Sequence, residues 1–214
     1  MTKGGLKSLV LIILLIGFAF LAYSQSKDQK TNEIGEPFFP PLIFNANPDL
    51  NSFVVDWYSK QLTALHEPSL WEISKSSKLE IYRFLWLRTF HAPIVIRLNI
   101  NSDRTGALTV KATSGKGGYE PGELIKDESR SLSKAEAQSF LDMIEKQKYW
   151  SLPTKEEDPN VVNLDGAQWV LEGVRNGTYK IVDRWSPEEG SIRKLGIRFL
   201  FGIAKIKLPS QEVY

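Results

Sequence analysis

The chain has 214 residues, of which 42% are hydrophobic and 24% are charged, so it is long and apolar enough for one globular domain with a sizeable core. Its formal net charge is +2, and without Lys3 and Lys7 the remainder is neutral, which does not supply the clustered positive charge of a nucleic-acid-binding protein. The absence of cysteine excludes a disulfide framework, a cysteine zinc site, a thiol nucleophile and a lipid anchor on cysteine.

The N-terminus carries the three-part pattern of an export signal over residues 1–24. Two lysines precede an uncharged, almost wholly apolar run from Ser8 to Tyr23, and Ala22 and Ser24 have the spacing of a signal-peptidase site. The run is a little shorter than the ~20 residues of a spanning helix, so a cleaved signal peptide and a retained membrane anchor remain alternative interpretations. In both, the lysines stay on the cytoplasmic side, and the domain is periplasmic or anchored to the cytoplasmic membrane outside the cytoplasm.

Residues 25–47 are predicted to form a polar tether that ends in a proline-rich, extended segment, because proline biases the residue before it to extended geometry. This segment is expected to lay Phe38, Phe39, Ile43 and Phe44 on the domain. Residues 48–208 are then a single globular α+β domain.

A first helix is predicted to start at Pro48. Asn47 is a suitable cap, proline fits the first helical position, and Asp49 favours the positive helix end. Spacings of three and four residues then predict one apolar stripe that faces the core. Its members are Leu50, Phe53, Val54, Trp57 and Leu65.

The middle of the chain is rich in β-forming residues. Runs at 79–90, 93–100 and 107–114 are separated by short turns, and an edge-like strand is expected at 123–132. A helix with a capping box of Ser133 and Glu136 follows.

After a hairpin, Ser186, Pro187 and Glu189 are expected to cap and start a last helix. Its apolar stripe is Ile192, Leu195, Phe199 and Ile203. Two interpretations of its basic side chains stay open, a solvated face of a core-packed helix and contact with an anionic membrane. The order of elements predicts an α+β fold, with an antiparallel sheet of about five or six strands and two or three helices packed on one side of it.

The hairpin is indicated by Asn176-Gly177, which suits a two-residue turn with positive φ. This turn fixes a register in which Trp169 faces Arg184, and it places Glu172 and Asp183 on one mostly apolar face, diagonally across the strands.

Two interpretations of Glu172 and Asp183 remain open. They belong to a structural network with arginines, for which Arg83, Arg88 and Arg97 are the candidates, or they act as an acid–base pair in a hydrolase. Which face of the hairpin is buried also stays open.

His91, at a turn between strands, is a further candidate for catalysis beside Arg88. The chain lacks an HExxH motif, a phosphate-binding loop with the usual spacing and a GxSxG elbow, and its two histidines lie in unrelated elements. No cofactor and no metal are therefore predicted.

Several blocks together resemble a family of uncharacterised bacterial exported proteins. They are "YRFLWLRTFHAPIVIRL", "GGYEPG", "DGAQWVLEGV" and "YKIVDRWSPEEGSIRKLG", and the likeness covers roughly residues 79–200. The resemblance implies a bacterial envelope protein and carries over no activity. It adds weight to a set of positions as candidates for a site: Arg88, His91, Trp169, Glu172, Asp183, Arg184 and Trp185.

These features predict an exported envelope protein with a non-enzymatic binding or accessory role. Arg88, Trp169, Arg184 and Trp185 are the expected binding residues, and the expected partner is an unknown protein or small ligand of the envelope. The membrane is a partner only through an uncleaved N-terminal segment. The alternative is a hydrolase of an envelope polymer that uses Glu172 and Asp183, with His91 assisting.

Overall fold

A computed structural model describes residues 36–76, 78–156 and 165–214. The predicted export segment and the tether up to residue 35 lie outside the described residues, and the residues from Pro37 onward form one unit. Among the helices of the described ranges, none has the length and apolar character needed to cross a membrane.

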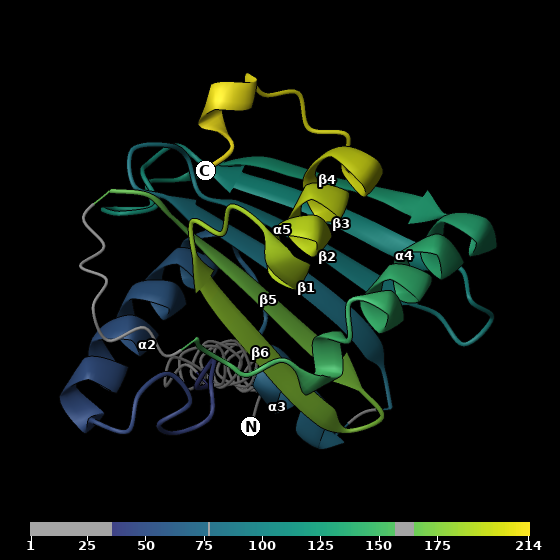
Figure 1. The fold of residues 1–214 in the computed structure, drawn as a ribbon, viewed down its shortest axis with the longest axis horizontal. Helices are drawn as coiled ribbons and strands as arrows, with labels where there is room; N and C mark the ends of the chain where they lie inside the picture. Colours follow the sequence, from purple (N-terminus) through teal and green to yellow (C-terminus); the bar gives the residue numbers. More distant parts are fainter. Residues whose placement is uncertain (1–35, 77, 157–164) are drawn as a thin grey trace, which may run out of the picture. The chain divides into compact units, whose positions relative to one another are not determined.

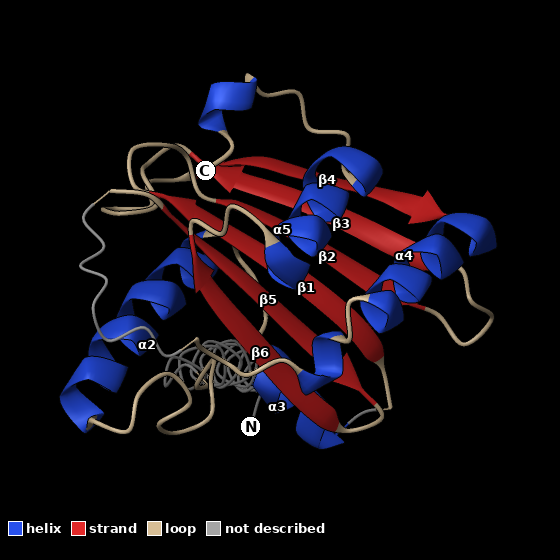
Figure 2. Ribbon diagram, in the orientation of Figure 1, coloured by secondary structure: helices blue, strands red, loops and turns tan. Residues whose placement is uncertain are grey.

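Six strands form one antiparallel sheet in the order β4-β3-β2-β1-β5-β6 (Figures 1 and 2). Their bounds are β1 Glu80–Arg88, β2 Ile94–Ile100, β3 Gly106–Thr113, β4 Leu124–Leu132, β5 Ala167–Arg175 and β6 Thr178–Trp185. The predicted α+β class and strand number are confirmed, and β4 lies at an edge as expected.

Helices cover both faces of this sheet (Figure 1). On one face lie α4 (Lys134–Lys146) and α5 (Gly190–Ile197), and on the other lie α2 (Pro48–Ala64) and α3 (Leu70–Ser76). The prediction of helices on one side only is therefore wrong. It failed because β1 is buried on both sides of the strand, so each face needs its own cover. The shorter helical segments are η1 (Tyr149–Ser151), the π-helical η2 (Arg198–Ile203) and η3 (Ser210–Glu212).

The core under α4 and α5 is built on aromatic rings. Phe199 of η2 stacks on Phe84 of β1 at 5.6 Å between ring centroids and meets Phe140 of α4 edge-on at 4.9 Å. The predicted stripe of the last helix is buried in this core: Ile192, Leu195, Phe199 and Ile203. This burial matches the interpretation of a core-packed helix.

The start of the last helix differs from the prediction. α5 begins at Gly190, and Glu189 precedes it without a capping hydrogen bond from its side chain. Ser186 has a positive φ of 36°, and its hydroxyl instead accepts a hydrogen bond of 2.8 Å from the Ala167 amide. Ser186 thus joins the end of β6 to the start of β5, and it does not cap the helix, which begins four residues further on.

The start of α2 is as predicted, because the Asn47 side chain accepts hydrogen bonds from the amides of Asp49 and Leu50. Its buried face is only partly as predicted. Leu65 is buried and Val54 and Trp57 pack against the core, whereas Leu50 and Phe53 are 56% and 70% exposed. The buried positions are Asn51, Tyr58, Gln61, Leu62 and, just after the helix, Leu65.

Two buried amides explain why the helix is turned away from the expected face. The Asn51 side chain accepts a 3.0 Å hydrogen bond from the Phe44 amide, and Gln61 Nε2 donates to the carbonyls of Gly117 at 3.2 Å and Tyr119 at 3.0 Å. A pattern of apolar residues assigns both amides to solvent, whereas the Asn51 oxygen and the Gln61 nitrogen find tertiary partners inside.

The extended segment before α2 packs as predicted. Phe39 and Phe44 are buried, and both meet Tyr58 edge-on, at 6.3 Å and 5.3 Å between ring centroids. Phe38 and Ile43 pack against the same cluster while remaining partly exposed. The segment therefore completes the apolar core between α2 and the sheet.

The variants Phe53→Ala and Leu62→Ala distinguish the two faces of α2. Phe53 is mostly exposed, so its truncation is expected to change the free energy of unfolding by less than about 0.5 kcal/mol. Leu62 is fully buried, so its truncation is expected to cost about 2–5 kcal/mol. Urea denaturation measures both values. Equal losses in the two variants would overturn this assignment of the buried face.

Candidate functional site

The β5–β6 hairpin has the predicted turn and register. Asn176 and Gly177 both have positive φ, and Trp169 faces Arg184 across the strands. Both faces of the hairpin are buried, one under α5 and the other under α2 and α3. Glu172 and Asp183 share the second face, as expected.

Glu172 is fully buried, and both of its carboxylate oxygens are engaged. Oε2 accepts a 2.7 Å hydrogen bond from Arg83 Nε and lies 2.6 Å from Arg83 NH2, and Oε1 accepts from the Tyr179 hydroxyl at 2.9 Å. Burial raises the pKa of the Glu172 carboxyl, and the Arg83 guanidinium opposes that shift. Arg83 directly faces Glu172 across β1 and β5, and its positive charge thus neutralises the Glu172 carboxylate.

Glu67, in the turn between α2 and α3, extends this group into a larger buried charge network. Its carboxylate lies 2.8 Å from Arg97 Nε, 3.1 Å from Lys111 Nζ and 3.5 Å from Arg83 NH1. We use "buried charge network" for Glu67, Arg83, Arg97, Lys111 and Glu172. Sequence reasoning missed Glu67, because a single acid in a turn carries no pattern that marks it as buried.

Asp183 is also buried but has different partners. Its Oδ2 accepts a 3.0 Å hydrogen bond from the Tyr58 hydroxyl and lies 3.5 Å from Lys155 Nζ. Burial raises the pKa of the Asp183 carboxyl, while Lys155 and the Tyr58 hydrogen bond oppose the shift. Glu172 and Asp183 therefore share a face without acting on a common group, an arrangement that favours the interpretation as structural ion pairs.

Arg88 and His91 contact the last residues of the chain. Arg88 NH1 donates to the Glu212 carboxylate at 2.9 Å, and His91 Nδ1 shares a 2.8 Å hydrogen bond with the Tyr214 hydroxyl. His91 Nε2 lies 3.8 Å from the same Glu212 carboxylate.

Trp169 lies beneath these residues and is fully buried. It faces Trp86 across β1 and β5, and both indole N–H groups donate to the main-chain oxygen of Tyr214, at 2.9 Å and 3.3 Å. Two of the expected binding residues, Arg88 and Trp169, thus hold the chain's own last residues, so neither is presented to solvent as a binding surface.

Arg184, a third expected binding residue, binds the segment 153–156, which precedes the undescribed residues 157–164. It donates to the carbonyls of Pro153 and Thr154, both at 3.0 Å, and to the Glu156 carboxylate at 2.8 Å. Because its donors are occupied by the chain itself, Arg184 has a local structural role.

Trp185 differs from the other predicted residues because it lines an open cleft of about 640 Å³. We name this the aromatic cleft. Its aromatic lining consists of Phe53, Trp57, Tyr119 and Trp185. Its polar lining includes Asp56, Lys60, Glu120, Asp165 and Gln168.

One wall of the aromatic cleft is a stripe of α2. Positions 53, 56, 57 and 60 are spaced so that their side chains share one side of the helix. The sequence pattern assigns Phe53 and Trp57 of this stripe to the core. Trp57 packs against the core and also lines the cleft, whereas Phe53 is exposed to the cleft.

A second wall is the glycine-containing loop 115–122, which contributes Tyr119 and Glu120. The Gly117 amide donates to the His91 carbonyl at 2.9 Å, and Trp57 Nε1 donates to the Gly117 carbonyl at 2.8 Å. A Cβ on Gly117 would lie 2.7 Å from the Arg88 carbonyl oxygen, so only glycine allows this close approach. His91 thus contributes to the site through its main chain, by holding the loop.

The third wall comes from the start of β5 and the end of β6. Gly166 and Thr89 bind each other, since the Thr89 hydroxyl donates to the Gly166 carbonyl at 3.0 Å. A Cβ on Gly166 would lie 2.6 Å from the Trp185 ring, so this glycine leaves the space that the indole occupies. Asp165 and Trp185 both line the cleft at this wall.

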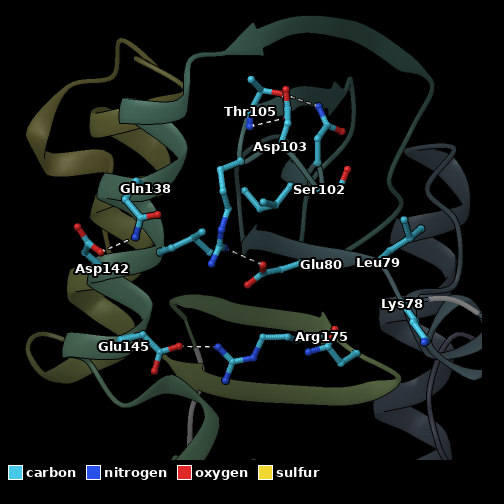
Figure 3. Close-up of a pocket in the computed structure, with 15 residues that line it drawn as sticks. Lys78, Leu79, Glu80, Ser102, Asp103, Thr105, Gln138, Asp142, Glu145 and Arg175 are labelled. Carbon is cyan, nitrogen blue, oxygen red and sulfur yellow. Dashed lines mark hydrogen bonds and ion pairs between the residues drawn. The ribbon is translucent and has the colours of Figure 1, made fainter.

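A second, more polar pocket of about 900 Å³ lies between the β2–β3 turn, α4 and the β5–β6 turn (Figure 3). Two ion pairs join Arg104 to Glu80 and Arg175 to Glu145, and Gln138 donates a hydrogen bond to Asp142. The lining of this pocket holds three basic and four acidic residues, whereas that of the aromatic cleft holds one basic and three acidic residues, so the aromatic cleft has the larger net negative charge.

Within the described ranges, no group of three or more histidine and acidic side chains is arranged to hold a metal ion. The chain matches no protein-family model, no curated protein and no solved structure.

Glu67→Gln tests the importance of the buried charge network. It leaves Arg97 and Lys111 buried without their shared counterion, so a loss of about 3–5 kcal/mol in unfolding free energy is expected. Glu120→Gln is the matched control, because it breaks an exposed ion pair with Lys60 worth about 0–1 kcal/mol. Urea denaturation compares the two. A loss in Glu67→Gln no larger than in the control would contradict the proposed role of the network.

Proposed function

We propose that the protein is an exported, non-enzymatic binding domain of the envelope that holds a ligand in the aromatic cleft. One observation carries this proposal: Phe53 is 70% exposed on a helix whose other face is buried, and it faces a cleft with three further aromatic residues. Ligand sites are typically concave, rich in aromatic side chains and supplied with a few polar groups. The size and lining of this cleft fit that description.

The hydrogen bonds that join the cleft walls support a binding role. Trp57 and Gln61 of α2 both donate to main-chain carbonyls of the loop 115–122, and the loop is also hydrogen-bonded to the turn after β1. A site whose walls are already joined has less ordering entropy to lose when a ligand binds.

The burial and pairing of the two expected catalytic carboxylates favour a non-enzymatic role over the hydrolase alternative. Glu172 and Asp183 are buried and engaged by Arg83, Tyr179, Tyr58 and Lys155. A glycosidase needs both carboxylates beside the scissile bond, with room for substrate and water. Export of the domain is supported by the sequence pattern of residues 1–24 alone.

The proposal is tested by equilibrium dialysis of the full-length chain against a small-molecule extract of a bacterial envelope, with mass spectrometry of the retained compounds. We expect the native chain to retain at least one compound and Phe53→Ala to retain it about five- to tenfold less, since an aromatic contact contributes about 1 kcal/mol. Leu50→Ala removes an exposed side chain of the same helix outside the cleft and should leave retention unchanged.

Two outcomes would overturn the proposed function. One is identical retention by the native chain and Phe53→Ala. The other is the appearance of cleaved envelope polymer with the native chain but not with Glu172→Gln, which would instead establish the hydrolase.

A further inference from the structure

We infer that the aromatic cleft binds an organic cation, meaning a positively charged nitrogen that carries apolar substituents. This inference rests on the proposed function, because it names the ligand class of the same cleft.

The charge of the cleft lining favours a cation. Three carboxylates line it, Asp56, Glu120 and Asp165, against one basic residue, Lys60. Lys60 forms an ion pair with Glu120, so its charge is already matched. In the part of the chain that the structure describes, no basic side chain pairs with Asp56 or Asp165. The remaining charge of the site is therefore negative and disfavours phosphate or carboxylate ligands.

The aromatic side chains favour the same kind of ligand. The face of an aromatic ring carries negative charge density and attracts a cation that lies over it. Phe53 and Tyr119 are 70% and 58% exposed, so most of each side chain is open to a ligand, and Trp57 and Trp185 line the cavity while remaining partly buried.

Rings and carboxylates occur together on two walls of the cleft. Asp56 lies on α2 in the stripe that presents Phe53 and Trp57, and Asp165 and Trp185 belong to the β5–β6 wall. A cation with apolar substituents can contact the rings and also pair with the carboxylates, whereas a purely apolar ligand would leave the carboxylates without a partner. The volume of about 640 Å³ leaves room for those substituents.

Choline and its uncharged isostere 3,3-dimethylbutan-1-ol test the inference by isothermal titration calorimetry on the full-length chain. The two probes have the same shape and differ in the charged nitrogen. We expect choline to bind at least about tenfold more tightly than the alcohol, with a dissociation constant that rises with ionic strength.

Single substitutions assign the binding to the cleft. Asp56→Asn and Asp165→Asn are each expected to weaken choline binding about three- to tenfold and to leave the alcohol unaffected. Asp142→Asn removes an exposed carboxylate of the other pocket and serves as the matched control, for which no change is expected. An equal effect of all three variants would overturn the assignment to this cleft.

Three results of the calorimetry would overturn the ligand class: equal affinities for choline and the alcohol, tighter binding of the neutral sugar N-acetylglucosamine than of choline, or no measurable heat with choline. The proposed function fails separately. If dialysis yields a neutral compound whose retention depends on Phe53, only the ligand class is wrong. If Phe53→Ala retains every compound, the binding role of the cleft is wrong as well.

Discussion

The convergence of three cations on the buried carboxylate of Glu67 is the interaction on which the rest of the structure depends. The cations come from three neighbouring strands, as Arg83 of β1, Arg97 of β2 and Lys111 of β3. Burying any one of these charges alone costs several kcal/mol, so the arrangement is stable only while all partners are in place. Arg83 also donates to the Pro68 carbonyl at 2.6 Å. The turn between α2 and α3 is thereby fixed to the middle of the sheet.

Because this turn is held against the sheet, the position of the C-terminal end of α2 is fixed. The buried amides of Asn51 and Gln61 determine the rotation of the helix about its axis. Phe53 then points away from the core, and Trp57 lies between the core and the aromatic cleft. Gln61 also binds the carbonyls of the loop 115–122, which places Tyr119 across from the helix. The aromatic cleft is therefore a consequence of how polar groups are satisfied inside the protein, and it links the stability of the fold to the proposed binding role.

The sequence predicts local features well where one physical rule decides them. Asn176-Gly177 determines a turn and hence a register, and the caps of α2 and α4 follow from side chains that can bond the first amides. Prediction from the sequence fails where contacts with residues distant in the chain determine which side chains are buried. Nothing local shows that Glu67 is buried, and Phe53 fits a core stripe until Asn51 and Gln61 are known to point inward. The cleft combines five separate parts of the chain, so no single spacing in the sequence displays all of its members.

Hydrogen–deuterium exchange of the variant Lys111→Met tests most directly whether the buried charge network holds α2 against the sheet. Methionine fills similar space but removes the ammonium group of Lys111, which binds both the Glu67 carboxylate and the main-chain oxygen of His66. We expect the amides of α2 to exchange about tenfold faster, whereas the amides of α4, on the other face, keep their protection. Unchanged exchange in α2, or an equal increase in both helices, would contradict the account.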